Sequence, residues 1–490
     1  MAFTCAVLVS VLLASCHRNT VLVETPNAMV GNRGRLVYET VPDSLRTTDI
    51  PVIYFTDRLD QSLDEDGRTD PDAMPDYGTD RSQDISFGVA RVTLDPEPTW
   101  DELVKASTTQ NRARTFGLSV GEVTRSGTIT SLERRLRVVE GQVVYPPEAS
   151  AAFAQDLSDF RDTITPFLTD APDGNAALVF VHGFNNTFDD AVLRLAQTWH
   201  AAGRHGVPIV FTWPAGFDTF LAPVAYNHDR ESGEFSVLQL KTLLMALSAD
   251  ERIDRIHVVA HSRGTDVATT ALREITAEIE AAQGRTFFSQ RTKQALGASS
   301  QFIEPALDGS VDPSDVLKLE TLVLVAPDLD IDIFTQRFLA ERVMRVARRV
   351  VVYTSKLDGA LGMARMFFAS RDRLGDTRME DFDPASRALI GQLPSLEFVQ
   401  CRVGGVSSHA YLFEHPAALS DMILVVREGL APSPAGVHAS HPPSDVVWRG
   451  LLPAHRPLQM IEPGFFLLDE GYLEAGAESD TTSETSSPVG

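Results

Sequence analysis

The stretch Ala260-His261-Ser262-Arg263-Gly264 places a serine among small residues where an apolar run gives way to polar sequence. A strand before the serine and a helix after it are the setting of the nucleophile elbow, whose usual pattern is G-x-S-x-G. Ala260 stands in place of the first glycine and is the smallest departure from that pattern. The stretch predicts that Ser262 is a nucleophile, and the alternative is a serine that only caps the following helix.

A second motif, His182-Gly183, ends an apolar run earlier in the chain. In folds with a nucleophile elbow, a tetrahedral oxyanion is stabilised by two backbone N–H groups, one from the residue after the nucleophile and one from a loop after an earlier strand. The two donors would be the N–H groups of Arg263 and Phe184. A His-Gly pair alone is usually only a turn, but here the two motifs follow separate expected strands in the expected order.

The elements around these motifs alternate between strands and helices, as in a parallel sheet covered by helices. A helix is expected to begin near Thr187, which can cap it, and others are expected over 235–247 and from about 265 to 282. The expected strands are 177–181, 208–213, 255–260, 322–326, 350–354 and 398–403. Ligands bind at the carboxyl ends of the strands in open α/β sheets, so the polar clusters after these strands would share one edge.

At this point the chain resembles the α/β-hydrolase superfamily and, more narrowly, a bacterial family of such hydrolases whose function is unassigned. The matching stretches cover most of residues 51–413: IPVIYFTDR, LVFVHGFNNTFDDAV, IVFTWPAG, YNHDRESGEFS, HVVAHSRGTD, LVLVAPDLDIDIF, VVVYTSKLDGAL and GGVSSHAYLF. The resemblance implies a serine-hydrolase fold with Ser262 as nucleophile, an acid after a late strand and a histidine after the last strand. Arg263 stands where similar proteins often have Met, and Phe184 where Tyr is common. The Arg263 cation could favour an anionic substrate or could pair with Asp266.

The base is expected beyond the last strand, because the order in this fold is nucleophile, acid and histidine. His409 lies just beyond the strand expected over 398–403 and is the preferred candidate. His415 is its competitor. Another stretch of the resemblance, Asp229-Arg230-Glu231-Ser232, is explained equally well as a surface ion pair or a helix start.

The acid would hold the imidazole in one tautomer and stabilise the imidazolium. Asp358 follows the strand over 350–354, whereas Asp328 and Asp330 follow the strand over 322–326. Asp358 is preferred because its strand directly precedes the one that leads to His409, and because Gly359 allows a tight turn. Asp358 could otherwise be a turn residue, and Asp328 could cap a helix.

Composition excludes several classes of protein. The 490 residues, 43% of them hydrophobic, are enough for one large core or two moderate ones. A formal net charge of -24 without a clustered basic face opposes nucleic-acid binding. Three cysteines are too few for a disulfide framework or a four-cysteine zinc site, and the histidines show no metal-ligand spacing. We therefore expect no metal, no cofactor and no nucleic-acid partner.

The first twenty residues, MAFTCAVLVSVLLASCHRNT, read as an export signal. Their apolar core, residues 6–14, is too short to span a bilayer. Its end, Leu13-Ala14-Ser15-Cys16, resembles the bacterial lipobox, which implies lipidation of Cys16, although no Lys or Arg precedes the apolar run. The expectation is a lipid-anchored protein of the bacterial cell envelope that faces the periplasm or the exterior. An ordinary cleaved signal or a misassigned start codon is the alternative.

The chain thus divides into a signal peptide (1–15), a β-rich N-terminal region (16–170), an α/β-hydrolase domain (171–430) and a C-terminal extension (431–490). The N-terminal region contains short strand-like runs, such as 51–55 and 87–94, and a long acidic loop, DEDGRTDPDAMPDYGTD. The last residues, GAESDTTSETSSPVG, have little to bury and are expected to be disordered.

Two functions from different classes fit these features. The first is a serine esterase or lipase that uses a Ser-His-Asp triad on a carboxylic ester of a small molecule or lipid, through an acyl-enzyme. The preference for an ester over an amide is analogy from the fold. The second is a membrane-anchored binding or scaffold lipoprotein that keeps the hydrolase fold without turnover.

Overall fold

A computed structural model describes most of the chain. The described residues are 20–25, 37–63, 73–110, 112–131, 133–144, 146–168, 174–217, 219, 222–282, 312–359, 361, 372–403, 409–429 and 458–469. The expected signal peptide, Cys16, residues 64–72 of the acidic loop and the chain after residue 469 lie outside them.

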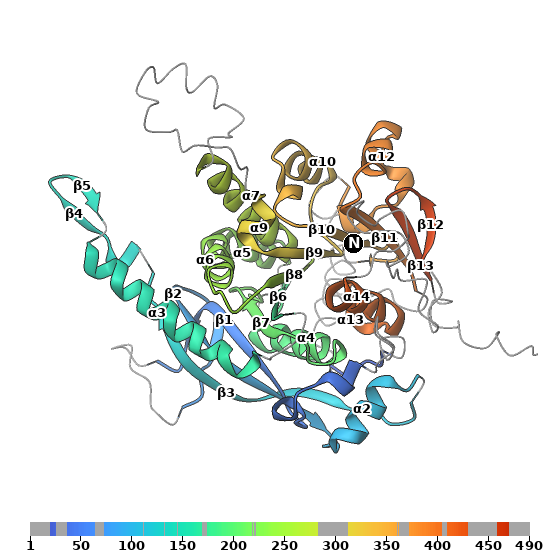
Figure 1. Cartoon of the computed structure of the whole chain (residues 1–490), viewed down its shortest axis with the longest axis horizontal. Helices are drawn as coiled ribbons and strands as arrows, with labels where there is room; N and C mark the ends of the chain where they lie inside the picture. The colour runs from blue at the N-terminus through green and yellow to red at the C-terminus, as the bar shows by residue number, and fades with distance from the viewer. Residues whose placement is uncertain are drawn as a thin grey trace, which may run out of the picture.

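One large sheet forms the centre of the described structure (Figure 1). Its order is β12-β13-β11-β10-β9-β8-β6-β7-β1-β2-β3. The strands are β1 (Ile50–Asp60), β2 (Tyr77–Asp95), β3 (Gly117–Ile129), β6 (Ala176–Val181), β7 (Val207–Thr212), β8 (Arg255–His261), β9 (Leu319–Val325), β10 (Arg349–Thr354), β11 (Leu396–Arg402), β12 (Gln459–Glu462) and β13 (Phe465–Asp469). The strands from β1 across to β13 pair in parallel, and antiparallel pairs occur only at the two ends of this sheet. The predicted fold class, an α/β-hydrolase fold, is confirmed, and each strand expected between residues 177 and 403 is present as one of β6 to β11.

Helices cover both faces of the sheet (Figure 1). The main ones are α3 (Pro147–Ile164), α4 (Phe188–Ala201), α5 (Ala222–Phe235), α6 (Val237–Ser248), α7 (Gly264–Ala282) and α14 (Pro416–Glu428). Helices α4 and α14 cover one face, and α6 and α7 pack together on the other. The strands between them are buried on both sides, which explains their continuous apolar runs. Within the described residues, no helix is both long enough and apolar enough to cross a membrane.

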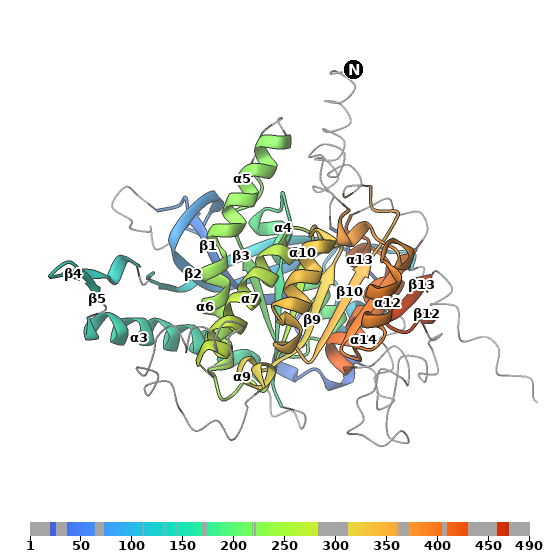
Figure 2. The ribbon, with the colours of Figure 1, turned by 90° about the horizontal axis from the view of Figure 1, so that it is seen from above.

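The helix expected near Thr187 is confirmed as α4. Thr187 is its N-cap, and its side chain accepts from the Asp190 N–H while the Asp190 carboxylate accepts from the Thr187 N–H. Helix α6 corresponds to the helix expected over 235–247, and α7 to the helix expected to 282. Helix α5, which stands out from the other helices in Figure 2, was not predicted.

The N-terminal strands belong to the same sheet as the hydrolase strands. Strand β1 pairs in parallel with β7, with Ile53 opposite Ile209 and Thr56 opposite Thr212. Strands β2 and β3 continue the sheet in antiparallel fashion. At the other end, β13 in the C-terminal extension pairs in parallel with β11. The parallel pairing of β1 places the residues that follow Thr56 at the carboxyl edge, beside the loops after β6 and β7.

Candidate active site

Ser262 lies in a tight turn between β8 and α7. Its φ is +53°, a left-handed conformation that a residue with a side chain rarely adopts. Small neighbours permit this turn: a Cβ on Gly264 would lie 2.2 Å from the carbonyl oxygen of His182, and one on Gly183 would lie 2.7 Å from Cβ of Ser262. Strand β8 and helix α7 can therefore approach the loop after β6 only because glycines stand at these positions.

Hydrogen bonds from neighbouring elements fix the backbone of Ser262. Its N–H donates to the carbonyl of Val325, at the end of β9, over 2.9 Å. Its carbonyl accepts from the Thr265 hydroxyl over 2.6 Å and from the Asp328 N–H over 3.2 Å. Hydrogen bonds thus hold the Ser262 backbone at both its N–H and its carbonyl group. The residue as a whole is only 4% exposed.

His409 connects Ser262 to Asp358. Its Nε2 lies 2.5 Å from Oγ of Ser262, and its Nδ1 lies 2.6 Å from Oδ2 of Asp358. The Asp358 carboxylate accepts from Nδ1–H, which leaves Nε2 free of a proton and able to accept from the serine hydroxyl. Asp358 comes from the turn after β10 and has a side chain that is 0% exposed, whereas the His409 side chain, just before α13 (Tyr411–Glu414), is 21% exposed. The structure brings these three predicted residues into one hydrogen-bonded chain.

The charge environment stabilises the imidazolium form of His409 more than water stabilises that of a free histidine. Burial works against the imidazolium, but the attraction and hydrogen bond of Asp358, with a smaller contribution from Asp328, outweigh it. Arg194 opposes them weakly. The pKa of His409 is therefore raised above its ordinary value.

The competing histidine and acids have other contacts. His415 is the N-cap of α14, where its Nδ1 accepts from the Ala417 N–H over 3.2 Å. Asp328 accepts from the Tyr226 hydroxyl over 2.8 Å and lies 3.2 Å from Nε of Arg373. The helix cap expected at Asp328 is formed instead by Asp330, at the start of α10 (Ile331–Thr335).

The two candidate oxyanion donors flank the serine. Arg263 follows Ser262 directly, and Phe184 follows Gly183, which packs against Cβ of Ser262. Across the described parts of the chain, neither backbone N–H donates to a protein acceptor. The ring of Phe184 packs on that of Tyr226 from α5, with centroids 5.6 Å apart.

His182 shapes the start of the Phe184 loop. Its Nε2 accepts from the Trp213 N–H over 3.0 Å, so Nδ1 carries the proton and donates to the Gly183 carbonyl over 3.0 Å. The His182 ring stacks on Trp213, whose indole N–H donates to the His182 carbonyl over 2.9 Å. Burial, with the Arg58 charge, lowers the pKa of His182 to about 3. His182 is therefore a neutral, structural residue of this loop.

Arg263 forms the ion pair that was one of its two expected roles. Its guanidinium lies 2.7 Å from the Asp266 carboxylate and packs over the Tyr226 ring. Asp266 also pairs with Arg337, 2.6 Å away. The Asp266 carboxylate on α7 is thus shared between two cations, Arg263 beside the serine and Arg337.

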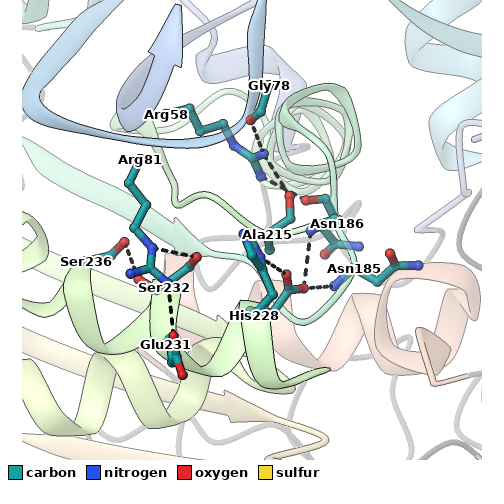
Figure 3. Close-up of polar contacts among 12 residues, drawn as sticks. Arg58, Gly78, Arg81, Asn185, Asn186, Ala215, His228, Glu231, Ser232 and Ser236 are labelled. Carbon is teal, nitrogen blue, oxygen red and sulfur yellow. Dashed lines mark hydrogen bonds and ion pairs between the residues drawn. The ribbon is translucent and has the colours of Figure 1, made fainter. Parts of the chain in front are cut away.

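Sequence reasoning missed two buried charged residues near the site, Arg58 and Asp229. Asp229 was explained equally well as part of a surface ion pair or of a helix start, but it lies within α5 and is fully buried at 0% exposure. Arg58 was quoted only as part of a matching stretch, and it is 1% exposed. Both contact the loop that contains Phe184, and Figure 3 shows the contact that Arg58 makes. A charged residue shortly after the apolar run 51–55 is the signal that would have marked Arg58.

The described residues contain no group of three or more His, Cys, Asp or Glu side chains arranged to hold a metal ion.

A mostly parallel sheet with a serine in a strained turn between a strand and a helix defines an α/β hydrolase. The family model described as "Alpha/beta hydrolase of unknown function (DUF900)" matches residues 158–427, more than half of the chain, and the protein belongs to this family. The superfamily resemblance seen in the sequence is thereby confirmed. No curated protein matched the chain, and no solved structure did.

Proposed function

We propose that this protein is a serine hydrolase that cleaves a carboxylic ester through an acyl-enzyme. The observation that carries the proposal is the chain of contacts from Ser262 through His409 to Asp358, with separations of 2.5 Å and 2.6 Å. A serine hydroxyl is a weak nucleophile at its own pKa, and an adjacent base oriented by a third group activates it. The membership of the chain in an α/β-hydrolase family supports the same reaction class.

The reaction would proceed in two halves. Nε2 of His409 takes the proton of Ser262 as Oγ bonds to the carbonyl carbon, and the N–H groups of Phe184 and Arg263 stabilise the oxyanion. When the carbonyl re-forms, the alcohol leaves with the proton from His409. A water then gives a proton to His409 and attacks the acyl carbon. When the bond from that carbon to Oγ breaks, the acid leaves and His409 returns the proton to Ser262. These steps need no cofactor.

The substrate class is a small-molecule or lipid ester. Ester hydrolysis is proposed over amide hydrolysis by analogy with the superfamily, in which esterases and lipases are common.

Labelling with a fluorophosphonate tests the proposal, because this reagent reacts with an activated serine. Native protein is expected to become labelled, and Ser262→Ala is expected to stay unlabelled under the same conditions. If neither protein is labelled, the serine is not activated and the non-catalytic scaffold becomes the better explanation.

Asp358→Asn is expected to reduce turnover by up to about 10⁴-fold with little change in melting temperature. The amide would present N–H to Nδ1 and favour the wrong imidazole tautomer. The comparison variant is Asp328→Asn, which weakens the ion pair with Arg373 and should mainly lower stability. Turnover of an activated ester and the melting temperature are measured for both variants. A stable, inactive Asp328→Asn beside an active Asp358→Asn would transfer the role to Asp328.

Turnover should depend on pH through His409, which acts only when neutral. Because its pKa is raised above the ordinary value, neutral imidazole is lost as pH falls through that raised pKa. We expect kcat/KM to decline on the acid side, with its midpoint above 6.5, the ordinary value for histidine. A pH profile of kcat/KM measures the midpoint, and one below that value would contradict the raised pKa.

We further propose that the protein is anchored in the bacterial cell envelope by acyl chains on Cys16, facing the periplasm or the exterior. Several acyl chains hold a protein stably, since each buried methylene contributes about 0.8 kcal/mol. Cys16→Ser is expected to move the protein from the membrane fraction to the soluble fraction and to abolish incorporation of a labelled fatty acid. Cys5→Ser is the matched control, and membrane association that survives Cys16→Ser would refute the anchor.

A further inference from the structure

We propose that Arg58 and Asp229 are positioning residues that together hold the backbone of the loop from Gly183 to Thr187, which carries the Phe184 N–H. The expected effect of these residues on catalysis rests on the proposed function, because the Phe184 N–H is an oxyanion donor only if the protein is a serine hydrolase. The effect on the loop itself does not.

Arg58 reaches this loop because β1 lies beside β7. Thr56 pairs with Thr212, and its hydroxyl donates to the Thr212 carbonyl over 2.6 Å. Two residues later, the side chain of Arg58 lies at the carboxyl edge of the sheet and is 1% exposed. A cation is thus buried directly beneath the loops after β6 and β7.

The guanidinium binds carbonyls and a hydroxyl. Nη2 donates to the Asn186 carbonyl over 2.8 Å, and Nη1 donates to the Ala215 carbonyl over 2.9 Å (Figure 3). Nη1 also donates to Gly78 over 2.8 Å, and Nε donates to the Thr212 hydroxyl over 2.9 Å. The fixed fork of an arginine thus joins the loop after β6 to the loop after β7 and to the strand β2.

Asp229 joins the same two loops through their N–H groups. Its Oδ2 accepts from Asn185 over 2.8 Å and from Gly216 over 3.2 Å. Its other oxygen lies 3.3 Å from Nδ1 of His228. The Asp229 contacts and the Arg58 contacts thus lie on the same pair of loops, and Figure 3 shows the contacts of Arg58 with Ala215 and Asn186.

The loop has a conformation that needs such support. Asn185, directly after Phe184, has a φ of +55°, and Gly216 in the facing loop has a φ of +93°. A left-handed non-glycine residue persists only where its surroundings hold it. The carbonyl contacts of Arg58 and the N–H contacts of Asp229 hold the chain on either side of this residue, and so set the direction of the Phe184 N–H.

The N-terminal strands also hold the helix that carries Asp229. The Ser236 hydroxyl, at the end of α5, donates to Asp57 over 2.6 Å. Nε of Arg81 on β2 donates to the Ser232 hydroxyl over 3.0 Å. Arg58, Asp57 and Arg81 all lie before residue 158, where the family match begins, so this part of the chain contributes to the site.

The first variant pair is Asp229→Ala and Asp229→Asn. Alanine removes the acceptor of both N–H groups, whereas asparagine can keep an oxygen in the place of Oδ2. We expect Asp229→Ala to be labelled by a fluorophosphonate about 10²-fold more slowly than native protein, because misplacement of a reacting group by about 1 Å has a cost of that order. We expect Asp229→Asn to recover most of the rate. Glu234→Ala, at an exposed position of the same helix, is the control and should be labelled at the native rate.

The second variant is Arg58→Lys, which keeps the charge but loses the fork. Its control is Arg91→Lys on β2, whose side chain is 47% exposed. The double variant that combines Arg58→Lys with Asp229→Ala tests whether the two residues hold one loop. If they do, its fold-loss in labelling rate should be clearly smaller than the product of the fold-losses of the two single variants. Thermal melting of each variant shows whether a slow rate reflects global unfolding.

Hydrogen–deuterium exchange of the full-length protein gives a readout that does not need activity. Peptides that span residues 182–187 should exchange faster in Asp229→Ala than in native protein, while peptides from β9 and β10 should be unchanged. The proposal would be overturned if the loop in Asp229→Ala exchanged at the native rate. It would also be overturned if Asp229→Ala and Arg58→Lys were both labelled at the native rate. If native protein is not labelled at all, the proposed function fails, and loop exchange alone then decides whether Arg58 and Asp229 hold the loop.

Discussion

Ser262→Ala is expected to lower the rate of ester hydrolysis by up to about 10⁶-fold, the loss typical of a triad nucleophile. Oγ of Ser262 is the atom that would form the acyl bond, and no other hydroxyl is known from the described residues to contact Nε2 of His409. Removal of one oxygen leaves the elbow backbone and its hydrogen bonds in place. The rate is measured with an activated ester, and the melting temperature should stay close to the native value.

Ser248→Ala is the matched control, because Ser248 lies at the end of α6, where its hydroxyl donates to the Met245 carbonyl. It should hydrolyse the ester at the native rate. Substantial turnover by Ser262→Ala, in a preparation free of other hydrolases, would end the serine-hydrolase proposal.

His409→Ala is expected to cost nearly as much as loss of the serine, since triad residues act as a unit and their effects do not add. Without the imidazole, no other base is known from the described residues to contact the serine hydroxyl, and Asp358 loses the ring that it orients. The double variant Ser262→Ala with His409→Ala should therefore be no slower than either single variant. Initial rates of the three variants, measured at one pH on the same ester, check this prediction.

His415→Ala is the control for His409→Ala, because it removes a histidine six residues along the chain that caps α14. It should lower the melting temperature modestly through loss of that cap, with turnover largely retained. An inactive His415→Ala beside an active His409→Ala would show that the base had been assigned to the wrong histidine.

Local sequence was sufficient to predict the parallel sheet, most of its helices and the elements that carry Ser262, Asp358 and His409. Buried parallel strands leave continuous apolar runs, and each candidate side chain lies in the segment that follows such a run. Helix α4 was predictable for the same local reason, since Thr187 and Asp190 form its capping box. Helix α5 was missed because its residues, APVAYNHDRESGEF, mix proline, glycine and charge without a clear apolar stripe.

Residue type could not separate His409 from His415, or Asp358 from Asp328. Both histidines follow β11, and both acids follow buried strands, so each pair is alike in local sequence. Their contacts differ because β10 and β11 are neighbours in the sheet, which brings the turn after β10 to the segment that contains His409.

The sequence by itself determined the fold class and the serine turn, because strand periodicity, helix caps and the need for small residues in a tight turn are local properties. Only the tertiary structure decided that Arg58 and Asp229, far apart in the chain, lie on the same two loops. The residue type of an arginine or aspartate does not show whether its charge is buried or solvated. What distinguishes them is the parallel pairing of β1 with β7, a long-range contact that places Arg58 beneath the loop that follows β6.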